Sequence, residues 1–307
     1  MWVSTPFLYS DCHFDDVTFT KNVNRSSMFL KFVGNCLRCR KKYMQPDTFI
    51  ISFKLHSYYK LGRHDAQLVD KWVRFAIESK VKELDLRVQD YCIPQFVFTA
   101  SSLTQLRFHA LEFEVASLSN SSSLTQLKLR PLKLEVPFLS KFPPLKVLSL
   151  SYVESNYESF QNLISGCLII EDLHLQDLNE IHPMHEYLLD IASIISIEAP
   201  NLFQANLSLT DGGYGSASCF DLLHFLANLH GLKKMKLSLF WEEDIIFPED
   251  IRNTSSPPLP NLKHLEASLN DEHKKNSELL DFLVWCVPSV ETLKINGKIL
   301  LQVLGSF

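Results

Sequence analysis

A six-residue phrase, apolar-x-x-apolar-x-apolar, recurs along most of this 307-residue chain and constrains its fold more than any other feature. It occurs nine times from Val81 onward, as VKELDL, LTQLRF, LTQLKL, LKVLSL, IEDLHL, LFQANL, LKKMKL, LKHLEA and VETLKI. Successive copies start 22, 21, 21, 25, 32, 30, 30 and 28 residues apart, and a weaker copy, IISFKL, begins at Ile50. Periods of this length with this phrase are typical of leucine-rich repeats.

The spacing inside the phrase predicts a strand with one apolar face. The fourth and sixth slots lie two residues apart, so their side chains point to the same face of a strand. One such strand cannot bury that face alone, whereas strands stacked in parallel form a continuous apolar wall. We therefore expect an α/β fold, a leucine-rich-repeat solenoid (horseshoe) with a parallel concave sheet of about 9–11 strands and an irregular, helical convex side.

Several segments between the phrases predict helices because apolar residues recur in them at the helical spacing of three and four residues. These segments are Asp65–Lys80, Phe160–Cys167, Leu222–Leu229 and Leu279–Cys286. Between Val81 and Leu150 the connections are shorter and rich in serine and proline, which favours extended or 3₁₀ turns. Residues 176–201 lie in the longest step between phrases, where we expect an irregular insertion with a further short strand around Ile194 and Ile197.

Charge and cysteine content narrow the class of protein. The net charge of −5 does not favour nucleic acid or an anionic membrane as a partner. The sequence contains neither an apolar run long enough to span a bilayer nor a signal peptide at its N-terminus. Its seven cysteines are odd in number and scattered, unlike a disulfide framework. We expect an intracellular protein, cytoplasmic or nuclear, with mostly buried thiols that include Cys167 and Cys286.

Sequence motifs that could carry chemistry are incomplete. Cys36 and Cys39 have the spacing of a metal-ligand pair, but no second pair follows at the distance found in zinc fingers. We therefore interpret them as core or surface thiols. His182 and His185 flank a proline and are interpreted as a loop, and the glycine-rich stretch 212–216 lacks a phosphate-binding signature. We therefore expect no enzyme, no catalytic residue, no metal site and no cofactor.

The predicted ladder places its third, fifth and seventh slots on the concave face. Across the nine phrases these slots hold seven cations and four anions. We expect a protein partner to bind there, and clustered arginines favour carboxylate or phosphate groups because their planar fork contacts two oxygens. The candidate partner-binding residues are Arg87, Arg107, His109, Lys128, Arg130, His174, Lys234 and Lys236. The alternative is a polar face that serves only solubility.

Four stretches together resemble a known family. VDKWVRFAIESKVKELDL (Val69–Leu86) looks like a helix leading into a first strong strand, SGCLIIEDLHL (Ser165–Leu175) and CVPSVETLKI (Cys286–Ile295) look like a CPxLExL repeat, and EAPNL begins at Glu198. Taken in their order along the chain, they resemble the leucine-rich region of plant F-box/LRR proteins of the FBD-containing type. Leu168 departs from the pattern, because a proline usually stands at its position.

The resemblance implies a function that the residues themselves do not. In that family an N-terminal F-box binds the Skp adaptor of a cullin ubiquitin ligase, and the repeats hold the substrate. No F-box pattern precedes Ser52, so we expect a capping or linker segment at 1–48, repeats at 49–307, and Met1 at an internal methionine of a longer parent. A Skp partner is expected only through an F-box in that parent. The alternative is a decoy, regulatory protein or ligand sensor that acts without a ligase.

Overall fold

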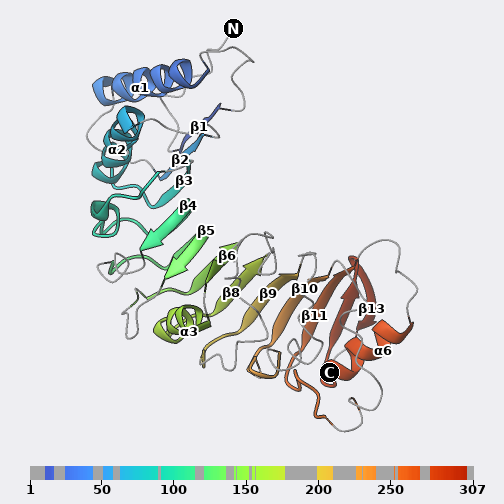
Figure 1. Ribbon diagram of the computed structural model, residues 1–307. Coiled ribbons are helices and arrows are strands. Elements are labelled where there is room, and N and C mark those ends of the chain that lie inside the picture. The colour runs from blue at the N-terminus through green and yellow to red at the C-terminus, as the bar shows by residue number, and fades with distance from the viewer. Residues whose placement is uncertain are drawn as a thin grey trace. The chain divides into compact units, whose positions relative to one another are not determined.

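The fold of the chain is given by a computed structural model, whose strands form two compact units (Figure 1). The first unit comprises residues 1–132 and 142–144, and the second comprises 133–141 and 145–307. The structure describes residues 11–16, 25–43, 51–57, 63–88, 91–114, 121–135, 142, 144–151, 154–155, 157–176, 199–209, 226–229, 231–239, 252, 255–269 and 277–302.

Strands of the first unit pair in the order in which they occur along the chain. The strands are β1 (Asp11–Asp15), β2 (Ser52–Ser57), β3 (Glu83–Val88), β4 (Gln105–Glu114) and β5 (Gln126–Glu135). The last residues of β5 belong to the second unit. The pairs β1–β2, β2–β3 and β3–β4 are parallel, and equivalent slots of successive phrases face each other, as Asp85 faces Arg107. This register confirms the predicted parallel ladder.

Most strands of the second unit also pair in the order in which they occur along the chain. Its strands are β6 (Val147–Ser151), β7 (Glu154–Ser155), β8 (Asp172–Gln176), β9 (Gln204–Leu209), β10 (Lys234–Leu239), β11 (His264–Leu269), β12 (Thr292–Ile295) and β13 (Lys298–Gln302). Parallel pairing runs from β6 through β8, β9, β10 and β11 to β12 without a register shift. Among the described strands of this unit, the short β7 alone lies off this path, and it pairs with the end of β5.

Apolar slots of the repeated phrase form the core. In the first eight phrases every first, fourth and sixth slot is buried; Leu148, Leu150, Ile170 and Leu173, for example, are 0% exposed. Burying a leucine contributes about 1.5–3 kcal/mol, so each phrase adds several kilocalories through its neighbours. The ninth phrase departs from this rule, because Ile295 is only half-buried.

A repeated pair of backbone hydrogen bonds sets the register of the ladder. The carbonyl oxygen of Lys82, in the second slot of its phrase, accepts hydrogen bonds from the N–H groups of Thr104 and Gln105 at 2.9 and 3.0 Å. The same arrangement recurs at the second-slot carbonyls of Ile51, Thr104, Lys146, Glu171, Phe203, Lys233 and Lys263. Because the bond pair involves only backbone atoms, phrases with different polar side chains stack in the same register.

Helices occupy the longer connections, as the apolar spacing predicts. They are α1 (Arg25–Tyr43), α2 (Arg63–Glu78), α3 (Tyr157–Gly166) and α6 (Ser277–Cys286), and the shorter connection after β3 contains the 3₁₀ turn η2 (Gln95–Val97). Figure 1 shows α1 beside α2 in the first unit, where a Cβ added at Gly34 would lie 3.8 Å from the Trp72 ring. Among the described helices, none is long and apolar enough to cross a membrane.

The last strand of the second unit reverses the direction of the ladder. β12 and β13 are antiparallel and joined by a tight turn at Asn296 and Gly297, with φ angles of 50° and 75°. Left-handed values at both central residues fit a two-residue hairpin, for which Asn-Gly is the favoured sequence. The repeated phrase does not predict this hairpin, which places Ile299 next to the polar slots of β12.

The structure describes three of the segments predicted from sequence only in part. β1 lies inside the segment 1–48 that was expected to cap the repeats, and it pairs in parallel with β2; the boundary at residue 48 stays a prediction. The short strand around Ile194 and Ile197 falls outside the described residues, and so does most of the insertion at 176–201. The helix expected at Leu222–Leu229 is described only from residue 226.

Candidate functional site

The third, fifth and seventh slots of the phrases form one continuous polar face within each unit, and we call it the polar face. Strand pairing sets these slots in columns: Asp85 lies beside Arg107, and Arg87 beside His109. In the nine strong phrases, Asp85 is the only buried residue in these slots, and the others are half-buried or exposed. The polar face therefore offers side chains from neighbouring strands at regular separations of about 4.8 Å.

The first unit brings together five of the predicted binding residues. Arg87 lies on β3, Arg107 and His109 on β4, and Lys128 and Arg130 on β5. Their charges are partly balanced, because Arg87 forms an ion pair with Asp85, with Nε 3.2 Å from Oδ1. Burial alone would raise the pKa of Asp85, but the neighbouring His56 and the Arg87 guanidinium outweigh it and lower that pKa.

His109 differs from the other four because it is neutral near pH 7. Burial lowers its pKa to about 4, and the positive charges of Arg130 and Arg87 act in the same direction. An imidazole in this state donates one hydrogen bond and accepts another but adds no charge. The permanently charged cations of this group are therefore Arg87, Arg107, Lys128 and Arg130.

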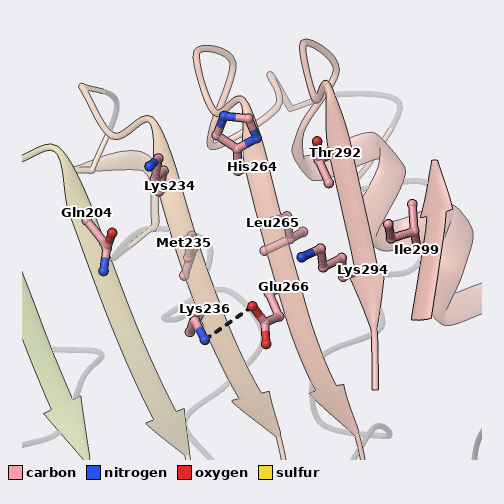
Figure 2. Close-up of a pocket in the computed structure, with 10 residues that line it drawn as sticks. All are labelled: Gln204, Lys234, Met235, Lys236, His264, Leu265, Glu266, Thr292, Lys294 and Ile299. Carbon is pink, nitrogen blue, oxygen red and sulfur yellow. Dashed lines mark ion pairs between the residues drawn. The ribbon is translucent and has the colours of Figure 1, made fainter. Parts of the chain in front are cut away.

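The second unit contains a hollow of about 410 Å³ on its polar face, shown in Figure 2. Five neighbouring strands, β9 to β13, contribute to its walls. The hollow is lined by Gln204, Lys234, Met235, Lys236, His264, Leu265, Glu266, Thr292, Lys294 and Ile299. We call it the lysine hollow, because lysine is its commonest side chain.

The lysine hollow contains more positive than negative side chains. Lys236 Nζ lies 3.2 Å from Glu266 Oε2, and Figure 2 shows this pair between β10 and β11. Lys234 has its ammonium 5.4 Å from the centre of the Phe203 ring, at the edge of the hollow. The Lys294 side chain points from β12 toward β11 (Figure 2). Neither Lys234 nor Lys294 forms an ion pair with any residue in the described ranges, so three ammonium groups share one carboxylate.

The predicted residues of the second unit separate into two groups. Lys234 and Lys236 line the hollow, whereas His174 lies on β8 and has its Nε2 3.2 Å from Asp172 Oδ1, outside the hollow's walls. Sequence reasoning placed His264, Glu266 and Lys294 in exposed slots but did not single them out. The alignment of the phrases could have revealed them, because it places equivalent slots of neighbouring strands side by side. The Asn296-Gly297 pair, which favours a hairpin, could have revealed Ile299.

Cysteines of the described residues are free. Cys167 is buried, and burial raises its pKa to about 12; burial also raises the pKa of Cys286. Cys36 and Cys39 are half-buried on α1. Burial raises the pKa of Cys36, and the neighbouring Cys39 adds a smaller effect in the same direction. Thiols with raised pKa values are weak nucleophiles near neutral pH. His182, His185 and the stretch 212–216 lie outside the described residues.

The stacked phrases, their shared second-slot bonds and the polar face define this chain as a leucine-rich-repeat protein. Residues 69–194 match the family described as FBD-associated F-box protein At5g56370, LRR repeats. The sequence resemblance to plant F-box/LRR proteins of the FBD type is thereby confirmed. The chain contains leucine-rich repeats related to those of such proteins.

Individual relatives support the same relationship. The chain is 25% identical over 198 residues to the F-box/FBD/LRR-repeat protein At1g13570 of Arabidopsis thaliana, a match that covers 64% of this chain and 37% of the relative. Two further F-box/FBD/LRR-repeat proteins of that plant are 25% and 24% identical, over 58% and 53% of this chain and 29% and 31% of theirs. The chain thus spans about a third of the length of these relatives.

Among solved structures, the chain is similar to the leucine-rich repeat-containing protein LegL7 from Legionella pneumophila. The TM-score is 0.47 and the sequence identity 14%, with 82% of this chain and 85% of that chain covered.

Proposed function

We propose that this chain is a protein-interaction module whose polar face binds an acidic, extended segment of a partner protein. We propose further that it serves as the substrate-recognition region of a ubiquitin-ligase receptor, in the intracellular space where such ligases work. The observation that carries the binding proposal is the lysine hollow, with three ammonium groups around one carboxylate. The ligase proposal rests on the relationship to F-box/FBD/LRR-repeat proteins.

The charge of the lysine hollow favours a carboxylate ligand. Glu266 balances one lysine, so Lys234 and Lys294 leave two positive charges for a partner to neutralise. Lysine is a compact point charge that contacts single oxygens, and it does not demand the planar geometry that arginine prefers. Because these ammonium groups reach solvent, the attraction is weakened by salt.

The dimensions of the hollow favour an extended segment. Lys234 and Lys294 lie on β10 and β12, two strand spacings apart and offset by two residues along the strands, which separates their backbone positions by about 12 Å. Carboxylates two or three residues apart in an extended chain are separated by about 7–10 Å, so two of them can reach both lysines. Arg107, Lys128 and Arg130 on the first unit form a second proposed contact region of the same chemistry.

A direct binding assay tests the hollow. The probe is a fluorescent extended peptide of about ten residues with glutamate at every third position, and its control has glutamine at the same positions. By fluorescence anisotropy we expect the glutamate peptide to bind wild-type protein and to lose about tenfold in affinity with the double variant Lys234→Glu, Lys294→Glu. Lys298→Glu, an exposed lysine of the same unit outside the hollow, should change the affinity less than about twofold.

Two outcomes of this assay would overturn the hollow as the binding site. One is equal affinity of the glutamate and glutamine peptides, which would show that charge is not recognised. The other is an unchanged affinity in the double variant. Circular dichroism of each variant establishes that the ladder is still folded.

The ligase role is tested separately. The chain is expressed in plant cells with and without an F-box segment fused to its N-terminus, and Skp, cullin and bound partner are measured after affinity purification. The proposal expects the partner in both samples, and Skp, cullin and ubiquitin-modified partner only with the F-box. A partner that binds but is never modified would instead indicate a decoy or regulatory protein that acts without a ligase.

A further inference from the structure

Four titratable side chains converge on the polar face at the first strands of the ladder. His13 and Asp15 lie two residues apart on β1 and therefore share a face. Asp15 is the register partner of His56 on β2, and Asp85 on β3 lies diagonally beyond His56. None of these four residues belongs to the lysine hollow, which lies in the other unit.

Distances within this cluster fit a shared cation. His13, Asp15 and His56 each offer one ligand atom, and these atoms all lie within 4.8 Å of one another. The imidazole rings of His13 and His56 have their centroids 5.1 Å apart at an angle of 72°. Nitrogen and oxygen ligands at about 2.0–2.2 Å from a zinc ion lie some 3.3–3.6 Å from each other, so small side-chain rotations would complete the site.

His56 supplies an independent observation. Its side chain is only 9% exposed, and its Nε2 is buried without a hydrogen-bond partner among the described residues. Both ring nitrogens face carboxylates: Nδ1 lies 3.8 Å from Asp15 Oδ2, and Nε2 lies 3.4 Å from Asp85 Oδ1. A neutral imidazole has one N–H and one lone pair, so one of these carboxylates faces a lone pair unless a cation lies between them.

The groups around His56 are those that a bound cation needs. His13, whose side chain is exposed, places a second imidazole beside the His56 ring. Asp85 faces the other nitrogen of His56 and is itself held by Arg87, the arrangement of a carboxylate that orients a ligating histidine.

We propose that His13, Asp15 and His56 form a binding site for a divalent transition-metal ion, with Zn²⁺ as the first candidate, and that Asp85 orients His56 from the second coordination sphere. Two histidines and one carboxylate are a donor set that such ions accept, with remaining positions open to water. The exposed side chain of His13 gives the ion access from solvent. The proposal goes beyond the expectation from sequence that no metal is bound.

Such an ion would join β1 to β2. Strand β1 is first in the strand order of the first unit, and among the described strands it pairs with β2 alone. A terminal repeat has fewer stabilising contacts than an internal one. The ion would therefore stabilise the first strands of the first unit, and this role is independent of partner binding at the lysine hollow.

The test uses the full chain, treated with a chelator and then freed of it by gel filtration. Isothermal titration with Zn²⁺ and visible absorption with Co²⁺ are compared for wild type, His13→Ala and Asp15→Asn. Glu291→Gln, which removes a carboxylate of the other unit outside the lysine hollow, is the matched control. We expect one ion per wild-type and control chain, at least tenfold weaker binding in both ligand variants, and a rise in the unfolding temperature with Zn²⁺ that the variants lack.

Clear results would overturn the proposal. Wild-type protein that binds neither Zn²⁺ nor Co²⁺ would remove it. Binding that survives unchanged in both ligand variants would place the ion elsewhere, for example at the Cys36–Cys39 pair, and would remove it equally. Both substituted side chains reach solvent, and circular dichroism confirms that each variant is folded, so a loss of binding is not a loss of fold.

Discussion

Lys236 and Glu266 face each other across β10 and β11, with Nζ 3.2 Å from Oε2. Both side chains are partly exposed, at 54% and 36%, so the pair is open to competition from solvent and ligands. An exposed ion pair of this kind contributes only about 0–1 kcal/mol. The pair therefore adds little to stability, and under the proposed function Glu266 competes with the carboxylate of an acidic ligand for Lys236.

Replacing Glu266 with glutamine should strengthen the binding of an acidic peptide. The substitution frees Lys236 and removes a repulsive charge from the hollow, and we expect affinity to rise about two- to fivefold. Fluorescence anisotropy with the glutamate peptide measures the change. Glu291→Gln is the control, since Glu291 pairs with Lys263 outside the hollow, 2.9 Å away. Equal gains in the two variants would show a general charge effect and would contradict a specific role of Glu266.

The proposed contact region of the first unit predicts a loss of partner affinity that is independent of the lysine hollow. Reversing Arg107 and Lys128 to glutamate should weaken binding of a natural partner by about tenfold if that partner spans the first unit. Surface plasmon resonance at two salt concentrations measures the affinity and the association rate. Reversal of Lys31, an exposed lysine on α1, controls for net charge. Unchanged partner binding in the double variant would remove the first unit from the binding face.

Core packing predicts a large and local difference between neighbouring slots. Leu173 on β8 is 0% exposed and pairs in register with Leu148, whereas Ser149 lies on the polar face between buried leucines. We expect Leu173→Ala to lower the free energy of unfolding by about 2–5 kcal/mol, and Ser149→Ala to change it by less than about 0.5 kcal/mol. Urea denaturation followed by circular dichroism measures both. Similar losses in the two variants would contradict the assignment of inner and outer slots.

His109 predicts a pH dependence of stability. Its pKa is about 4 in the folded chain, lowered by burial, Arg130 and Arg87, with Asp85 opposing and His56 adding to the effect. In the unfolded chain the value is about 6.5, so the unfolded state binds more protons between these two values. Stability from this group is complete above about pH 6.5 and is lost as the pH falls toward 4.

Comparison of wild type with His109→Gln isolates this contribution. Between about pH 7 and pH 5 we expect wild type to lose about 1–2 kcal/mol more unfolding free energy than the variant. Urea denaturation at both pH values provides the measurement, and effects of other groups, including His13, cancel in the difference. Equal losses in the two proteins would show that His109 is solvated like a free imidazole.

Much of the ladder was predictable because its determinants are local. Slots such as Leu84 and Leu86 alternate with polar residues, and this spacing alone fixes which face of the strand is buried. The helix α2 follows in the same way from the spacing of Val69, Val73 and Ala76, all buried. Since the repeats stack in register, columns such as Asp85–Arg107 could also be written down from the alignment of phrases.

The features that sequence reasoning missed depend on contacts between distant segments or on short turns. Strand β1 carries only Cys12 and Phe14 in buried positions, too few to match the phrase, so its pairing with β2 and the cluster around His56 were not anticipated. The lysine hollow needed the antiparallel β13 to supply Ile299 as a wall. Its signal, Asn296-Gly297, was present in the sequence but lies outside the repeat pattern.

The central claim is that the polar face recognises a protein partner through its lysines, and quantitative affinity purification tests it most directly. Wild type, the double variant Lys234→Glu, Lys294→Glu, and Lys298→Glu are used as baits in the same plant extract, and each purified partner is then titrated against all three. The account predicts a partner with an acidic segment that wild type and Lys298→Glu retain and that binds the double variant at least tenfold more weakly. Partners held equally by all three proteins would contradict it.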